Sequence, residues 1–166
     1  MTGTEKSKEI KEKEIDELDL NILRILGADG REKISNIAET LHRSPNTIKS
    51  HVEKMENDEI IKNYGISIDY EKLGYDIMAV IEITIAKGKM IEVEKKIAHL
   101  PNIFAVYDIT GTYDALILAK FKKRSELSEM VKEINSIEEV IRSNTHLILN
   151  VIKEGSDFGE LLNYEK

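Results

Sequence analysis

The stretch from Ile77 to Ile85 alternates between two kinds of side chain so regularly that it limits the possible folds more than any other part of the 166-residue sequence. Successive side chains of a β-strand point to opposite faces of its sheet. One face of this stretch is apolar throughout, and it is formed by Ile77, Ala79, Ile81, Ile83 and Ile85. We therefore predict a β-strand with one face on a hydrophobic core.

The patterns that follow this strand complete an α+β unit. Apolar residues at helical spacing precede Pro101, and a second helical pattern follows Ser125. Two strands flank Gly111 and Thr112 as a hairpin. The predicted elements are a helix from Met90 to Leu100, strands Ile103–Thr110 and Tyr113–Phe121, a helix after Ser125, and a strand Thr145–Ile152. Over residues 76–154 this βαββαβ order predicts a ferredoxin-like domain, with an antiparallel sheet and both helices on one face.

The second face of the predicted sheet also carries apolar side chains. We place Met78, Val80, Val106 and Ala119 on that face. Because the two helices cover only one face, an apolar second face predicts pairing with another subunit. The sequence thus favours a homodimer.

A different, helical periodicity governs residues 16–63. Leu18, Ile22 and Ile25 begin one helix, and Ile37 and Leu41 belong to a second. A third helix is entered by Ser44 as its cap and Pro45 at its first position, and its apolar stripe is Ile48, Val52 and Met55. Three short helices in this order predict a helix-turn-helix, in its winged form, whose last helix enters the major groove of DNA.

The remaining segments connect or flank these two domains. The alternation from Ile60 to Ile68 predicts a strand leaving the DNA-binding part, so that residues 64–75 form a strand and linker. Residues 1–15 alternate Lys and Glu and are predicted to be a charged tail, and residues 155–166 a C-terminal tail.

Composition limits the function classes. The sequence has 24 Lys plus Arg against 31 Asp plus Glu, a net charge of -7, which argues against DNA binding unless cationic groups gather locally. Cysteine is absent, so disulfides and thiolate metal sites are excluded, and we expect no cofactor or metal. No signal peptide and no apolar run of about 20 residues is visible, which predicts a cytoplasmic protein without a membrane partner. Abundant Glu, Lys and Ile favour a thermophilic source.

Two long runs resemble the Lrp/AsnC family, the leucine-responsive or feast/famine transcription regulators. The first is LDLNILRILGADGR followed by ISNIAETLHRSPNTIKSHVEKMENDEIIKNYGISIDYEKLG, and the second comprises ITGTYDALIL and IRSNTHLILNVIK. The resemblance covers about residues 16–153. It implies an archaeal regulator that forms dimers, and often tetramers or octamers, binds double-stranded operator DNA, and responds to an amino acid or a related small effector.

The third helix supplies the candidate DNA contacts. Asn46, Thr47, Ser50 and His51 lie away from its apolar stripe and are expected to reach bases. The expected contacts to DNA phosphates are Arg43, Lys49, Lys54 and Lys62, and the cap residue Ser44 completes the candidate DNA-binding set. Family members commonly carry two basic residues where this sequence has Ser50 and His51, so phosphate affinity is expected to be lower. The alternative is an ordinary solvated helix surface.

The predicted hairpin supplies the candidate effector site. Gly111 permits a close approach of the backbone, and Asp114 is suited to accept from an ammonium group. The loop between them contributes Thr112 and Tyr113. The resemblance implies that this loop meets the start of the last strand at a junction between dimers, where Ser143 and Thr145 supply hydroxyl groups beside Asp114. The alternative is that Gly111 makes the turn and Asp114 bonds its backbone.

Two other function classes compete with a regulator. Siroheme decarboxylases resemble the same family, but His42, His51, His99 and His146 fall in separate elements. Only His146 and Arg142 lie near the suspected pocket, and we see no catalytic constellation. We therefore expect no enzyme activity. An architectural protein that coats DNA without an effector calls for a basic surface, which the acidic balance opposes.

Overall fold

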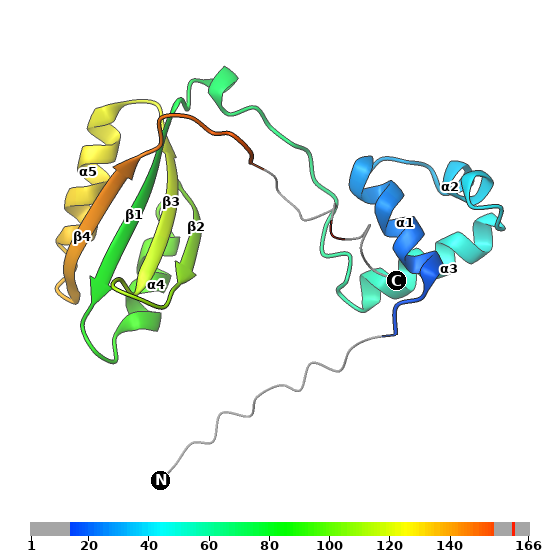
Figure 1. Cartoon of the computed structure of the whole chain (residues 1–166), viewed down its shortest axis with the longest axis horizontal. Coiled ribbons are helices and arrows are strands. Elements are labelled where there is room, and N and C mark those ends of the chain that lie inside the picture. The colour runs from blue at the N-terminus through cyan, green and yellow to red at the C-terminus, as the bar shows by residue number, and fades with distance from the viewer. Residues whose placement is uncertain (1–13, 155–160, 162–166) are drawn as a thin grey trace, which may run out of the picture. The chain divides into compact units, whose positions relative to one another are not determined.

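The computed structural model describes residues 14–154 and Leu161, and these residues divide into two compact units between Ser67 and Ile68 (Figure 1). Each unit has its own hydrophobic core. None of the helices in the described part of the chain is long and apolar enough to cross a membrane.

The first unit consists of three helices. They are α1 (Glu17–Ala28), α2 (Ile34–Thr40) and α3 (Pro45–Asn57). The helices meet around a small core, and its fully or almost fully buried members are Ile22, Ile37, Ala38, Ile48, Val52 and Met55. The predicted helix-turn-helix and the predicted apolar stripe of its third helix are therefore confirmed.

The second unit is a four-stranded antiparallel sheet with two helices. A 3-10 turn precedes it at Glu71–Leu73, and its elements are β1 (Ile77–Ile85), α4 (Met90–Ala98), β2 (Ile103–Asp108), β3 (Ala115–Phe121), α5 (Arg124–Asn135) and β4 (Val140–Leu147). The sheet order is β2-β3-β1-β4, which places β1 in the middle. This is the predicted ferredoxin-like arrangement.

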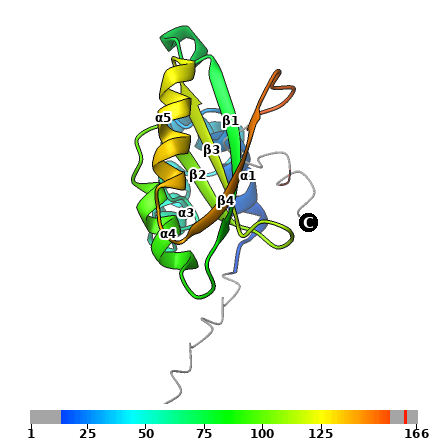
Figure 2. The ribbon, with the colours of Figure 1, turned by 90° about the vertical axis from the view of Figure 1, so that its left-hand side faces the viewer.

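Both helices lie on one face of the sheet, and Figure 2 shows α5 along that face. Val93 and Ile97 of α4 and Ile134 of α5 are fully buried against it. The alternating face of β1 forms the other half of this core, because Ala79, Ile81 and Ile83 are fully buried. Five alternating positions of one strand thus fix which face the helices cover.

Two residues predicted for the open face lie on the covered one. Ala119 is opposite Ala79 in the register and is fully buried, and Val106, opposite Ile117, packs against the same core. Directly opposite residues in antiparallel strands share a face, so the register overrules the earlier placement. Met78 and Val80 do lie on the face away from the helices.

The limits of three strands also differ from the predicted ones. The hairpin strands stop at Asp108 and start at Ala115, because residues 109–114 form a wider loop. The last strand runs from Val140 to Leu147 rather than from Thr145 to Ile152. A strand extends only where it has a partner, and the last backbone bond joins the Ile148 amide to the Met78 carbonyl near the start of β1.

The predicted strand between Ile60 and Ile68 has no partner strand among the described residues. Its apolar side chains from Tyr64 onward are exposed, with exposed fractions of 50% for Tyr64, 73% for Ile66 and 42% for Ile68. Tyr64 connects the segment to α3 by donating from its hydroxyl to Glu56 Oε1 at 2.8 Å. The Ile60 amide also bonds to the Met55 carbonyl, so the segment leaves directly from the end of α3.

Candidate DNA-binding and effector sites

The entry to α3 is fixed by a turn and a cap. His42 has a positive φ of 52°, and the Arg43 amide donates to the Ala38 carbonyl at 2.9 Å, which closes the turn after α2. Ser44 then accepts from the Thr47 amide at 3.1 Å, and Pro45 occupies the first helical position. This local chemistry fixes where α3 begins. The predicted cap is confirmed, and the Ser44 hydroxyl also contacts the Thr47 hydroxyl at 2.8 Å.

The two faces of α3 have opposite character. Ile48, Val52 and Met55 are buried against α1 and α2. Asn46, Thr47, Lys49 and Ser50 lie on the rest of the helix, and all but the half-buried Thr47 are exposed. Arg43 precedes this face and Lys62 follows it, and both are exposed. Lys49 forms a weak ion pair with Glu53 at 3.6 Å, in which both side chains are more than half exposed.

A buried carboxylate connects α1 to α3. Asp19 is 0% exposed, although charged side chains are rarely buried without partners. Its carboxylate accepts from His51 Nδ1 at 2.7 Å and from the Asp16 amide at 3.2 Å. The ammonium of Lys54 lies 3.8 Å from the same group. Burial by itself raises the pKa of Asp19, but the hydrogen bonds from His51 and Asp16 and the charges of His51 and Lys54 outweigh it and lower the pKa.

This network changes the role of two predicted DNA contacts. We predicted that His51 reaches bases, but its Nδ1 is bonded to Asp19 of α1 and only 23% of its side chain is exposed. Lys54 also donates to the Glu14 carbonyl at 3.1 Å. Sequence reasoning missed Asp19, but Asp16 and Asp19 form a capping box, whose three-residue spacing is visible in the sequence.

The predicted effector loop is an ordered turn between β2 and β3. The Ile109 amide donates to the Asp114 carbonyl at 2.9 Å, and Gly111 has a φ of 131°, a conformation that favours glycine. The carboxylate of Asp114 accepts from the Ile85 amide at 2.8 Å. Asp114 therefore joins the loop to the end of β1, rather than bonding the backbone of its own turn as the alternative predicted.

Arg142 of β4 covers this loop from the open face of the sheet. Its guanidinium lies 4.8 Å from the centre of the Tyr113 ring and donates to the Thr112 carbonyl at 3.4 Å. A third contact runs from Arg142 Nε to the Thr84 hydroxyl at 3.2 Å. The sequence placed Arg142 near the suspected pocket but gave it no role there, and the register of β4 sets its contacts with the loop.

Ser143 and Thr145 do not lie beside Asp114 on the open face. Ser143 is opposite Ile83 and Thr145 is opposite Ile81, so both hydroxyls belong to the helix-covered face of the edge strand. Arg142 is opposite Thr84 and occupies the open face instead. Within one subunit the two hydroxyls thus lie on the other face of β4 from Arg142, and their grouping with Asp114 at a junction between dimers, which the resemblance implies, stays a prediction.

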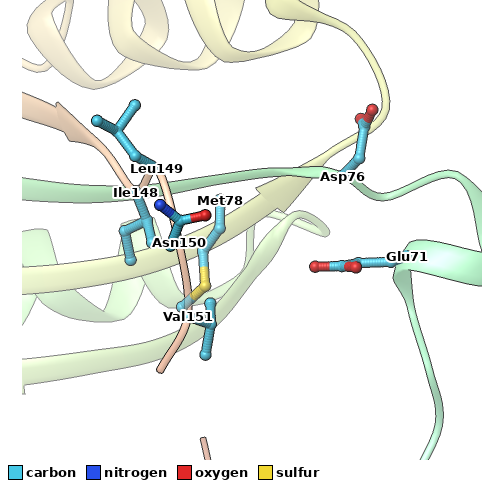
Figure 3. A pocket seen from close by; sticks show the side chains of 7 residues that line it. All are labelled: Glu71, Asp76, Met78, Ile148, Leu149, Asn150 and Val151. Atoms are coloured by element: carbon cyan, nitrogen blue, oxygen red, sulfur yellow. The ribbon is translucent and has the colours of Figure 1, made fainter. Parts of the chain in front are cut away.

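Neither of two hollows in the second unit contains the predicted effector residues. One, of about 240 Å³, lies at the start of β1 and is shown in Figure 3; it is lined by Glu71, Asp76, Met78, Ile148, Leu149, Asn150 and Val151. A wider one, of about 650 Å³, is lined by Gly88, Met90, Ile91, Glu92, Lys95 and Asp108. The loop of residues 109–114 meets the opposite end of β1 from Met78. The loop is thus a surface feature of a single subunit.

Comparisons with known proteins agree with this architecture. Residues 15–62 match the winged helix-turn-helix DNA-binding family, and residues 78–158 match the Lrp/AsnC ligand binding domain. An uncharacterized HTH-type transcriptional regulator of Pyrococcus furiosus is 38% identical over 141 residues, which is 85% of this chain and 95% of that protein. The HTH-type transcriptional regulator Ptr1 of Methanocaldococcus jannaschii is 31% identical, over 86% of this chain and 97% of its own length.

Solved structures share the fold. AsnC of Escherichia coli superposes with a TM-score of 0.82 at 26% identity, over 87% of this chain and 99% of that chain. A Neisseria meningitidis transcriptional regulator solved as a complex with L-Met has a TM-score of 0.80 at 23% identity, over 86% of this chain and 95% of its own. The chain belongs to the Lrp/AsnC family of helix-turn-helix transcription regulators.

Proposed function

We propose that this regulator reads double-stranded operator DNA with the exposed face of α3. The observation that carries the proposal is the division of α3 into a buried apolar stripe and an exposed polar face that begins at a capped N-terminus. Asn46 and Ser50, with Thr47 beside them, have the donors and acceptors that base edges present in the major groove. In this proposal Arg43, Lys49 and Lys62 contact the phosphate backbone of the DNA.

The proposed binding species is a homodimer. A single three-helix unit has few groups that reach bases, and two copies about 34 Å apart read two half-sites one helical turn apart. The open face of the sheet, with Met78 and Val80, and the exposed segment around Ile66 and Ile68 are the proposed contacts between subunits. Tetramers or octamers of such dimers raise the effective concentration on tandem sites.

The proposed effector is an amino acid or a closely related molecule. The Neisseria meningitidis regulator of the same fold was solved with L-Met, and the β2–β3 loop here offers backbone donors, Tyr113 and Arg142 together. Arg142 is a cation suited to a carboxylate. Because the loop is open in one subunit, we propose that a neighbouring subunit closes the site and contributes its Ser143 and Thr145. The bound effector then changes DNA affinity by changing how the subunits assemble.

Footprinting on the protein's own promoter region tests the DNA proposal. We expect two protected half-sites whose centres lie about one helical turn, roughly 10 base pairs, apart or a multiple of it. Uniform protection of any DNA would instead indicate an architectural protein. We propose that this chain is not an enzyme. An absorption spectrum that shows a bound tetrapyrrole would instead indicate a siroheme decarboxylase. We also propose that the protein is located in the cytoplasm, because a regulator must be in the same compartment as the DNA that it binds.

A further inference from the structure

One buried carboxylate joins α1 to α3 in addition to their shared hydrophobic core. Asp19 is fully buried, whereas its partners are not: the side chains of His51 and Lys54 are 23% and 50% exposed. Its oxygens are bonded to the Asp16 amide and to His51. A buried ionised carboxylate needs compensating charge close by. The ammonium of Lys54, 3.8 Å away, supplies it.

The same geometry argues against a metal ion as the source of that charge. Asp16, Asp19 and His51 place three ligand-type atoms within 4.8 Å of one another. However, the Lys54 ammonium sits beside the Asp19 carboxylate, and a cation bound there would have to displace it. The Asp16 carboxylate is also committed, because it accepts from the Asp19 amide at 2.8 Å. The cluster therefore serves as a connection between two helices.

We propose that Asp19 is a positioning residue for DNA recognition, which holds α3 in its reading orientation through His51 and keeps the Lys54 ammonium away from DNA phosphates. The inference rests on the proposed use of α3 to read DNA. His51 lies one residue after Ser50 and one turn after Thr47, so its anchoring to α1 fixes the rotation of the face that carries both. Lys54 lies one further turn along and shares the same carboxylate.

The distinguishing consequence concerns salt. Each phosphate that a cationic side chain neutralises adds about 0.9 to the slope of log affinity against log salt concentration. In the native protein Lys54 contributes little to that slope, because Asp19 already pairs with it. In Asp19→Asn, Lys54 is released and the slope becomes steeper by about one. At the same time the preference for the promoter fragment over random DNA falls about tenfold, because α3 is no longer held in register.

The experiment measures affinity by fluorescence anisotropy for the protein's own promoter fragment and for a random duplex of equal length, at several salt concentrations and one pH. The proteins are the wild-type full chain, Asp19→Asn, Lys54→Met and the double variant Asp19→Asn/Lys54→Met. We expect a steeper slope only in Asp19→Asn, a return to the wild-type slope in the double variant, and an unchanged slope in Lys54→Met. Circular dichroism establishes which variants are folded.

Several outcomes would overturn the proposal. A purely structural role for Asp19 predicts that both affinities fall by the same factor with no steeper slope. If Asp19→Asn does not fold, Lys54→Met decides: a slope lower by about one would show that Lys54 is an ordinary phosphate contact. Equal binding of promoter and random DNA by the wild type would reject the proposed operator recognition instead, while the slopes on random DNA would still test the role of Asp19.

Discussion

At the scale of single residues, the polar side chains of α3 fall into two groups, those that are exposed and one that is bonded to α1. Asn46, Lys49 and Ser50 are exposed, whereas His51 is hydrogen-bonded to Asp19 of α1. The sequence alone correctly placed the buried Ile48, because helical spacing determines which side faces the core. It could not assign His51, because His51 lies at the border between the two faces, and a buried carboxylate 32 positions away decides its direction.

Asn46 and Lys49 are expected to differ in the kind of DNA affinity they provide. Asn46→Ala removes a group that reads a base and should reduce the preference for the promoter by about 1–3 kcal/mol, with random DNA unaffected. Lys49→Ala should weaken all DNA equally and lower the salt slope by about one. Competition titrations with promoter and random duplexes measure both. Identical behaviour of the two variants would contradict the assigned roles.

Asp19 is expected to make the helical unit sensitive to acid. Its pKa is lowered from the ordinary 3.8, so its contribution to folding is complete above that value. The contribution is lost as the pH falls through the lower pKa of the folded state, because protonation removes the charge that His51 and Lys54 stabilise. The melting temperature of the wild type, followed by circular dichroism, should therefore drop steeply below about pH 4.

Asp19→Asn is the matched variant for this prediction. At neutral pH it should be less stable by roughly 1.5–3 kcal/mol, the usual range for hydrogen bonds to a charged group. Below the pKa of Asp19 the difference from the wild type should shrink, because the wild type is then uncharged at this position as well. A constant difference across the whole range would show that the Asp19 charge does not stabilise the fold.

At the scale of elements, α3 depends on its N-terminal cap. Ser44→Ala removes the acceptor of the Thr47 amide and should lower the free energy of unfolding of the helical unit by about 1 kcal/mol, measured by denaturant titration. Ser50→Ala is the control, since it changes the same residue type on the exposed middle of the same helix. It should not lower stability, because alanine favours helix interiors. Equal losses would reject the cap as the cause.

The β2–β3 loop depends on glycine for its backbone conformation rather than for space. A Cβ at Gly111 would meet nothing within 4 Å, but its φ of 131° strains any other residue. Gly111→Ala should therefore cost about 1–3 kcal/mol in the sheet unit, by thermal or denaturant unfolding. The same change at Gly27, which also meets nothing and lies within α1, should be neutral or stabilising. A neutral result at Gly111 would contradict the strain.

The elements of the sheet show what the sequence could and could not predict. The face of β1 was predictable because one strand contains five alternating positions. Ala119 and Val106 were misplaced because their faces depend on registers between strands, which a single sequence does not give. The early start of β4 at Val140 has the same origin, since pairing with β1 decides where β4 lies.

At the scale of the whole molecule, the net charge of -7 did not predict the function class. Acidic side chains can pair within the protein, as Asp19 does, while phosphate contact requires only a local cationic surface. The Pyrococcus relatives agree with the thermophilic source that the composition favoured and with the archaeal regulator that the family resemblance implied. The order of the helical and strand patterns along the chain therefore said more about function than the overall composition and net charge did.

Assembly is the property of the whole molecule that the proposed effector must change. Light scattering with and without each of the twenty amino acids should show a dimer or larger species whose mass changes with one or a few of them. Arg142→Gln should abolish that response and leave the dimer intact, because the guanidinium is the proposed carboxylate partner at the loop. A monomer under all conditions, or a mass and operator affinity that no amino acid changes, would remove the effector proposal.

The most direct test of operator recognition is a gel-shift titration of the purified chain on its own promoter region, at several salt concentrations and with excess unrelated DNA. We predict saturable shifts that survive the competitor and weaken as salt rises, because base contacts give selectivity and phosphate contacts give salt dependence. Binding that the competitor abolishes, or no binding at any salt concentration, would contradict the conclusion that α3 reads a specific site.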